Sequence, residues 1–498
     1  MKRFLTFALA GALVLGLSGA ALAVDVQVSG TWEFAFGWIK NEGFHDNDNG
    51  YDGNADNFLA RQRFRTQADF IVSERLRGVI MLEIGDSLEW GRDEDGSKVG
   101  NNGGGSIDTD GVNVATKLAY VDWLIPSTEV AVRMGLQYIV LPDAVGRGNP
   151  VLNSDVAALA VTVPFTEQVG LTAVWARPFD VNSNDGDGNH SLADEMDIFA
   201  LILPVNGEGW SFTPWAAYSR VGASSGLLEY AAGNSGANGA FGLDTENISF
   251  SGDDSADIWW GGLALEVTAF DPLTFGLNAM YGHMGKLEAT LDDGSGVLSD
   301  FDFRTAGWLL AASVDYKLDW GSVGLFGWYS TGDDEDDARD GEYGRLPAIG
   351  FDNGFAATGF GGPGSFGNGS DTVVSATFLG TWGIGVQLAD WSFVEDLSHT
   401  LRLSYYRGTN DHDVVERGTR DGYALAFSGE AVYLTDKDSA FEVNFDHVYN
   451  LYENLAMALE LSYIRLDLDE DVWDDAAGKD YADTSNAWKA QLLFQYNF

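Results

Sequence analysis

The last residues of the chain alternate between two kinds of side chain, and this pattern constrains the fold more than any other feature. One side of the expected strand is aromatic and apolar: Trp488, Ala490, Leu492, Phe494, Tyr496 and Phe498. The other side is polar: Lys489, Gln491, Gln495 and Asn497. A strand with these two faces suits a wall one sheet thick between hydrocarbon and water. The pattern therefore predicts a strand of a transmembrane β-barrel.

The same alternation recurs along the chain, beginning near residue 26. In the first such segment the apolar positions are Val26, Val28, Trp32, Phe34, Phe36 and Trp38. Later segments of this kind are Val130–Tyr138, Leu273–Tyr281, Trp308–Tyr316, Leu401–Tyr405, Phe441–Phe445 and Leu455–Tyr463. Trp and Tyr recur near segment ends, which is typical of the aromatic girdles at the two membrane interfaces. We expect the first and last strands to pair and close the barrel.

The connections between these segments alternate in length. Short turns are expected at Ser73–Arg75, Pro126–Thr128, Thr166–Gln168, Asn206–Gly209, Asp271–Pro272, Lys317–Asp319, Val394–Leu397 and Asn450–Asn454. Long loops are expected at 39–57, 85–114, 142–155, 178–194, 222–257, 282–304, 331–371, 408–439 and 467–485. This pattern predicts an all-β, up-and-down antiparallel barrel of about 18 strands, or 16 if one hairpin belongs to a loop, with both termini on the periplasmic side.

The N-terminus predicts export. Lys2 and Arg3 precede an apolar run from Phe4 to Leu17, and a small-residue stretch ends at Ala23. This is the pattern of a secretory signal peptide with an Ala-x-Ala cleavage site. The apolar run is shorter than the roughly 20 residues that a spanning helix needs. We expect residues 1–23 to be cleaved, and residues 24–498 to form a single barrel domain in a bacterial outer membrane.

The composition fits a wall of alternating faces and excludes several partners. The chain is 45% hydrophobic, yet its mean hydropathy is only −0.09, so apolar and polar residues must be interleaved. It has 75 acidic residues against 28 Lys plus Arg, a net charge of −47, which argues against nucleic acid as a partner. The acids gather in loop segments, where they are either solvated or loosely bind divalent cations that bridge to lipopolysaccharide. No other cofactor is expected, and there are no cysteines.

A ladder of arginines marks one expected strand. Arg61, Arg63 and Arg65 alternate with smaller or apolar residues within Phe58–Val72. An arginine facing lipid near the membrane midplane costs about 2–4 kcal/mol, so the three guanidinium groups should point into the lumen. There they either set the size and polarity of a constriction or pair with acids on neighbouring strands to stabilise the wall. Arg133 shares the expected lumen face.

With these patterns established, the chain resembles the homotrimeric general porins, particularly the acidic porins of sulfate-reducing bacteria. Phe494, Tyr496 and Phe498 are similar to the C-terminal signature that the barrel-assembly machinery reads in outer-membrane proteins. The resemblance implies a homotrimer with water-filled channels for passive diffusion of ions and small hydrophilic solutes. It also implies that an external loop folds inward opposite the basic wall. The corresponding loop is Pro142–Asp155, with Asp143, Arg147 and Asp155 as further candidate lining residues.

Four other functions share some of these sequence patterns. A substrate-specific channel would share the barrel but line one track with aromatics, and the expected lumen residues Trp215, Trp260 and Tyr406 are scattered. A plugged transporter would need a globular domain before the barrel. The histidines show no metal-ligand spacing, and no nucleophile elbow, phosphate loop or HExxH motif occurs. We therefore do not expect an enzyme. Whether the chain binds a metal stays open. A structural role in the envelope also remains open.

Overall fold

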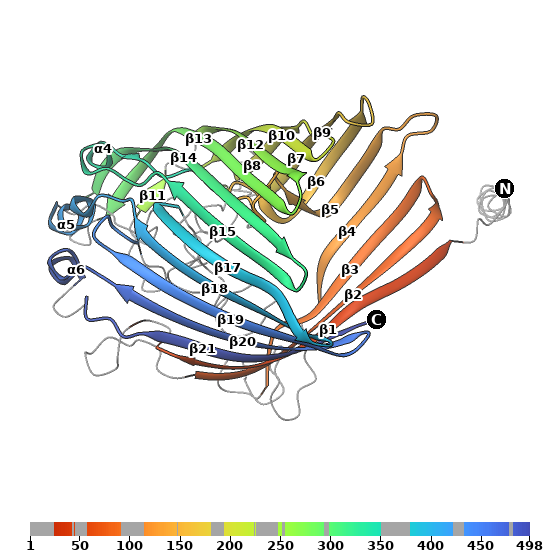
Figure 1. Cartoon of the computed structure of the whole chain (residues 1–498). Coiled ribbons are helices and arrows are strands. Elements are labelled where there is room, and N and C mark those ends of the chain that lie inside the picture. The colour runs from red at the N-terminus through yellow and green to blue at the C-terminus, as the bar shows by residue number, and fades with distance from the viewer. Residues whose placement is uncertain are drawn as a thin grey trace, which may run out of the picture.

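One antiparallel sheet closes on itself and encloses the centre of the molecule (Figure 1). β1 (Asp25–Lys40) pairs on one side with β2 (Asn57–Ser73) and on the other with β21 (Ala487–Asn497), so the first and last strands meet as expected. This computed structural model describes residues 24–41, 44, 57–90, 114–146, 148–180, 194–223, 225, 248–250, 254–292, 298–349, 379–421, 433–477 and 482–498. The expected signal peptide lies outside them.

The sheet has 21 strands, of which β9, β11 and β16 are short additions and the other 18 form the wall. The expectation of 18 strands is therefore confirmed. The remaining strands are β3 (Leu76–Glu89), β4 (Val114–Leu124), β5 (Ala131–Val140), β6 (Asn153–Pro164), β7 (Gly170–Asp180), β8 (Glu195–Ile202), β9 (Val205–Gly207), β10 (Trp210–Gly222), β11 (Ile248–Phe250), β12 (Ser255–Phe270), β13 (Leu273–Asp292), β14 (Leu298–Leu318), β15 (Gly321–Ser330), β16 (Glu342–Tyr343), β17 (Thr381–Val394), β18 (Leu397–Gly408), β19 (Ser439–Tyr452) and β20 (Leu455–Asp467).

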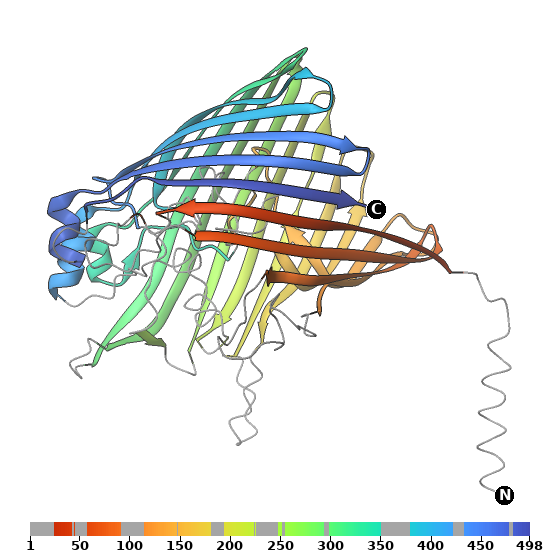
Figure 2. The same ribbon diagram turned by 90° about the horizontal axis from the view of Figure 1, so that it is seen from below.

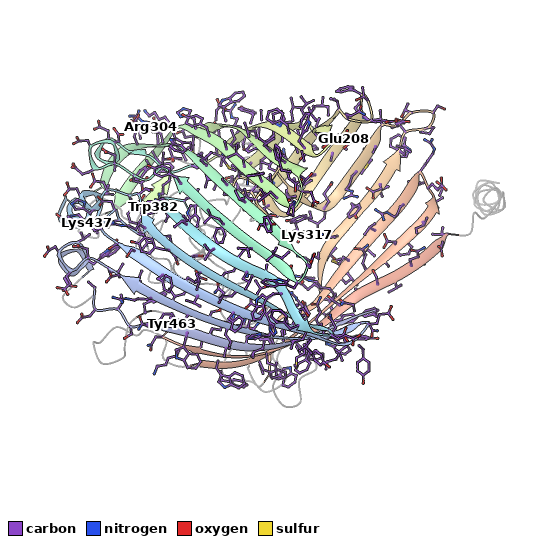
Figure 3. The ribbon with its side chains drawn as sticks, in the orientation of Figure 1. Glu208, Arg304, Lys317, Trp382, Lys437 and Tyr463 are labelled. Atoms are coloured by element: carbon purple, nitrogen blue, oxygen red, sulfur yellow. The ribbon has the colours of Figure 1, made fainter. Side chains whose placement is uncertain are left out.

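The two ends of the barrel differ. All the predicted short turns lie at one end, the turn end, together with the C-terminus and the start of β1 (Figures 1 and 2). The helices α4 (Glu335–Arg339), α5 (His412–Asp421) and α6 (Glu470–Ala477) lie at the opposite loop end. Glu208 and Lys317 mark the turn end in Figure 3, and Arg304 and Lys437 the loop end. No helix in the described ranges is long and apolar enough to cross a membrane.

One predicted loop is wrong. Residues 282–304 were expected to form a loop, but β13 continues to Asp292 and β14 starts at Leu298. The ladder resumes after a register shift between Met284 and Leu287 and runs to the pair Asp292↔Leu298. Acidic and small residues interrupt the apolar alternation in this hairpin, whereas the backbone hydrogen bonds that define a strand do not require an apolar face.

The outer face of the ring carries large exposed apolar side chains from all parts of the sheet. Examples are Trp32, Phe58, Phe70, Met134, Leu159, Phe199, Leu201, Trp259, Tyr281, Leu325, Ile384 and Trp488. Their positions follow the alternation, since each lies on the face opposite the buried residues of its strand. A continuous apolar surface of this extent is unfavourable in water and suits a hydrocarbon surrounding.

The inner face has two chemically different halves. From β5 to β15 it is mostly apolar, and we call this the apolar half: Ile139, Val156, Ala158, Val174, Met196, Ile198, Trp260, Met280 and Leu309. From β18 through β21 and β1 to β4 it is polar and charged, and we call this the polar half: Arg402, Glu442, Asn444, Lys489, Gln491, Glu33, Arg63, Arg65 and Glu83. Apart from Arg133 at the edge of the apolar half, the charges expected in the lumen are therefore gathered on one side of it.

Part of the apolar half is covered by segment 344–349, which lies against the inner face of β12–β14. Trp260 donates from Nε1 to the carbonyl of Pro347 at 2.8 Å, and Leu346 is fully buried. The backbone of this segment comes so close to β14 that a Cβ on Gly307 would lie 2.5 Å from the carbonyl oxygen of Gly344. Glycine is thus required at position 307 for the segment to pack there, and the packed segment narrows the enclosed space.

Candidate pore lining

The arginine ladder lies on the inner face of β2. Phe64 pairs with Trp32 of β1, and both rings are on the outer face, 5.5 Å apart. Because side chains alternate along a strand, Arg63 and its neighbours at positions 61 and 65 point inward. Arg63 donates from Nε to Glu33 at 2.8 Å, and Arg65 forms an ion pair with Glu83 of β3. The ladder therefore contacts acids on both neighbouring strands.

These ion pairs reduce the net charge that the ladder presents. Glu33 is 5% exposed and Glu83 7% exposed, so both carboxylates are buried under their arginine partners. The pairing agrees with the interpretation in which the ladder stabilises the wall. It does not remove the ladder from the lumen, because Arg65 still borders a cavity inside the barrel. A role in a constriction stays a prediction.

A second group of charges lies on the inner face of β2–β5 nearer the turn end. Asp122 of β4 accepts hydrogen bonds from Arg77 at 2.6 Å and from Nε and Nη2 of Arg133 at 2.6 and 3.0 Å. Arg77 also approaches Asp69 at 3.3 Å. The guanidinium of Arg133 stacks 4.4 Å from the centre of the Tyr120 ring. Arg133, which the alternation placed in the lumen, is thus held by a bidentate contact to one carboxylate.

The loop between β5 and β6 enters the barrel. The amide of Ala144 donates to Oδ1 of Asn278 at 2.8 Å, and the side chain of Asn278 donates back to Asp143. Asn278 belongs to β13, and its side chain lies on the inner face and is buried. Across the apolar half, the carbonyl of Pro150 accepts a hydrogen bond from the amide of Ile349 at 3.2 Å. The loop thus reaches the inner wall at β13 and meets segment 344–349.

The three loop residues singled out from the sequence differ in their positions. The carboxylate of Asp143 accepts from the amides of Val145 and Gly148 at 2.8 and 2.7 Å, so it organises its own loop. Arg147 lies outside the described residues. Asp155 lies in β6 rather than in the loop, opposite Tyr138 on the outer face. The expectation that Asp155 belongs to the loop is wrong because β6 starts earlier than the apolar alternation indicated.

Two cavities border this charged region. The first, of about 1000 Å³, is lined by Thr31, Arg65, Gln67, Met81, Lys117, Asp155 and Phe498 among others. The second, of about 720 Å³, extends toward the turn end and is lined by Arg77, Asp122, Arg133, Gln137, Val174 and Ile202 among others. Tyr138 lines both. These cavities lie along β1–β8, and their linings include residues of both faces of the sheet.

Sequence reasoning missed the aromatic side chains of the apolar half as a group. Trp215 and Trp260 are buried, and each covers a glycine of the neighbouring strand: a Cβ on Gly262 or Gly282 would lie 2.6 Å from the ring. Trp328 covers Gly383 in the same way, and its ring centre lies 6.0 Å from that of Tyr406. The glycines were a usable signal, because glycine inside a strand often marks a close approach by another group.

One cluster among the described residues has the composition of a metal site. Asp411, His412 and Asp413, at the start of α5, offer ligand atoms within 4.8 Å of one another. The Nδ1 of His412 also lies 2.8 Å from Oδ1 of Asp436, which already occupies this ring nitrogen. The cluster is solvent-accessible at the loop end, where acidic groups are expected on any surface of this charge.

The C-terminal residue is fixed by backbone and ring contacts. The amide of Phe498 donates to the carbonyl of Gly30 at 3.1 Å, and the amide of Gly30 donates back at 3.0 Å. The ring of Phe498 stacks on Phe64 with centres 5.8 Å apart, and on Tyr496 at 6.0 Å. Phe498 therefore completes the seam between the first and last strands.

No family model matches this sequence, and no curated protein matches it. Several solved structures are similar in fold. Pseudomonas aeruginosa OccK2 (OpdF), in complex with glucuronate, is 11% identical with a TM-score of 0.48 over 95% of this chain and 98% of that chain. Pseudomonas aeruginosa OccK9 (OpdG) is 12% identical with a TM-score of 0.49, again over 95% and 98%. A BenF-like porin from Pseudomonas fluorescens Pf-5 is 11% identical with a TM-score of 0.49 over the same shares.

Proposed function

We propose that this chain is an outer-membrane channel through which ions and small hydrophilic solutes diffuse passively. The observation that carries the proposal is a closed barrel of 18 wall strands with an apolar outer face and cavities on a charged inner face. A ring of strands that closes on itself pairs its backbone groups within the sheet, and fixed charges on its inner face favour water and ions there. The proposal requires no catalytic group and no cofactor.

The proposal places both chain ends in the periplasm and the helices α4–α6 outside the cell. In outer-membrane barrels the short turns are periplasmic and the long loops external, and the described turns and loops divide in this way. The partners proposed with it are outer-membrane lipid, lipopolysaccharide and the barrel-assembly machinery, the last acting on Phe494, Tyr496 and Phe498. We also propose that divalent cations bind loosely at the acidic loops. We further propose that the chain is related to the acidic general porins of sulfate-reducing bacteria.

A substrate-specific channel is the second candidate, and one observation favours it. Two inward segments, residues 141–146 with 148–152 and residues 344–349, meet over the apolar half, and the described cavities lie where the two halves adjoin. A narrow passage with one apolar and one charged side can orient a solute that has both kinds of surface. A wide water-filled channel needs no such packing.

Conductance in a planar bilayer tests the proposal and separates the two candidates. Discrete ohmic steps that grow in proportion to salt concentration support passive diffusion. Conductance that saturates, or that a small organic solute blocks at micromolar concentration, supports a substrate-specific channel. Purified, folded protein that produces no steps in repeated insertions contradicts both and leaves a structural role in the envelope.

The oligomeric state proposed with this function is a homotrimer. Native mass spectrometry of the detergent-solubilised protein is expected to give three times the mature mass, and the trimer should dissociate only on heating. A monomer under gentle detergent conditions would contradict the trimer without affecting the channel proposal.

A further inference from the structure

Among the described wall strands, β4 and β5 share the shortest ladder. The ladder that joins these strands contains only six pairs, from Leu124↔Ala131 to Ala119↔Leu136. Beyond it, residues 114–118 pair only with β3, and residues 137–140 pair only with β6. No described strand bridges the two free segments, and in Figure 1 β4 and β5 diverge away from their common turn.

The strands part at a defined place. Gly135 has φ +126°, a conformation that favours glycine, and a Cβ there would lie 2.2 Å from the carbonyl oxygen of Ala119. Beside it, the β3–β4 ladder shifts register between Met81 and Leu82, at the level of Lys117. The five residues of β4 that lack a β5 partner correspond to about 16 Å along the strand, more than half of an apolar band about 25 Å tall. The break is therefore too long to be a frayed end.

The larger cavity borders this break. At one end it is lined by Thr31, Arg65 and Gln67, whose side chains lie on the inner face. At the other end it is lined by Tyr138 and Asp155, which lie on the outer face of β5 and β6. Lys117 and Leu118 of the free segment of β4 and Tyr138 of the free segment of β5 also line this cavity, so it lies along the break.

An ion pair spans the break on its outer side. Lys117 of β4 donates from Nζ to Oδ2 of Asp155 of β6 at 2.5 Å, passing over the gap to β5. Tyr138 of β5, the strand between them, pairs with Asp155 in the β5–β6 ladder, and its hydroxyl donates to Asn153. Both partners of the ion pair are partly exposed, at 29% and 26%, so water or lipid headgroups can compete for them.

We propose that β4 and β5 form a lateral opening, latched by Lys117 and Asp155, through which small neutral amphipathic molecules pass between the lumen and the outer leaflet. The charged side chains that line this cavity are ion-paired, Arg65 with Glu83 and Lys117 with Asp155, which weakens their attraction for ions. Its lining includes Met81, Leu118 and Tyr138 beside Gln67 and Asn153, which suits a molecule with an apolar body and one polar group. This inference rests on the proposed channel for access to the lumen.

The test uses Lys117→Cys/Asp155→Cys in a porin-deficient Gram-negative host, because the chain has no cysteines of its own. A short, reducible bis-methanethiosulfonate reagent then joins the two positions across the break. Entry of N-phenyl-1-naphthylamine, a neutral amphipath, is measured by fluorescence. Entry of nitrocefin, a hydrophilic β-lactam, is measured by its hydrolysis in the periplasm. This rate reports the amount of active channel and serves to normalise the naphthylamine rate.

Crosslinking is expected to lower the ratio of naphthylamine entry to nitrocefin entry, and reduction should restore it. The matched control, Ala119→Cys/Leu136→Cys, joins β4 to β5 where they already pair, and should leave the ratio unchanged. Lys117→Ala should raise the ratio about two- to fivefold, the change in an opening equilibrium that follows loss of a partly exposed ion pair.

A ratio that neither crosslinking nor Lys117→Ala moves overturns the lateral opening and leaves the channel proposal intact. If no sample admits nitrocefin, the channel proposal fails, and the naphthylamine rate per folded protein then decides the lateral opening alone. Equal changes in the test and control pairs would also overturn it, because they would trace the effect to general stiffening of the wall.

Discussion

Replacing one arginine of the ladder should change ion selectivity, and replacing its whole ion pair should not. Arg63→Gln removes one positive charge and leaves Glu33, 2.8 Å from the lost guanidinium, without its partner. Arg63→Gln/Glu33→Gln removes both charges of the pair. If the ladder borders the ion path, only the first variant alters the net fixed charge that an ion meets.

The size of the effect follows from Coulomb's law. An ion that passes about 6 Å from a unit charge in water gains or loses about 0.7 kcal/mol, which is about threefold in local concentration. Cations rise and anions fall by that factor, so the permeability ratio should shift toward cations by up to about tenfold at low salt. The Debye length is about 3 Å at 1 M salt, so the shift should nearly disappear there.

Reversal potentials in a salt gradient across a planar bilayer measure this ratio for the parent and both variants. The expected order at low salt is a clear cation shift for Arg63→Gln and no shift for the double variant. Identical reversal potentials for all three proteins would show that the ladder does not border the ion path. A shift of equal size in both variants would show that changed geometry, not charge, is responsible.

Three further predictions concern assembly and the loop end. Deleting Phe498 removes the backbone pair and the ring contact that close the seam. The amount of folded barrel in the outer membrane should therefore fall, while export of the chain continues. Normal outer-membrane levels on a heat-modifiability gel would contradict this. Asp438 is fully buried and accepts hydrogen bonds from the amide and hydroxyl of Thr435 and from the indole of Trp473. Asp438→Asn should therefore destabilise the loop end by about 3 kcal/mol. Unchanged resistance of the loop end to proteolysis would contradict this prediction. Burial raises the pKa of Tyr433, which donates to Asp333 at 2.9 Å. An acid whose pKa is raised on folding stabilises the folded state at pH values below its unfolded pKa, which is about 10 for tyrosine, and this stabilisation is lost as the pH rises further. Cleavage of the loop end by an alkaline protease should therefore increase above about pH 10. In Tyr433→Phe this cleavage should depend less on pH.

The sequence by itself determined the wall of this protein. A strand needs only its own alternation to assign its faces, and Trp488 to Phe498 on one side predicted an outer face that the structure confirms. The short turns and the strand number also followed from local composition. For the same reason the inward direction of the ladder was predictable, because each arginine is placed by its immediate neighbours in the strand.

Only the tertiary structure decided what occupies the inside of the wall. The contact between Ala144 and Asn278 joins residues 134 positions apart, and nothing in either local sequence identifies its partner. Local alternation tells which side chains point inward, but not which of them other segments cover. The division into a packed apolar half and a charged half, and the break between β4 and β5, depend on such remote contacts, because packing is a property of surfaces that meet only after the ring has closed.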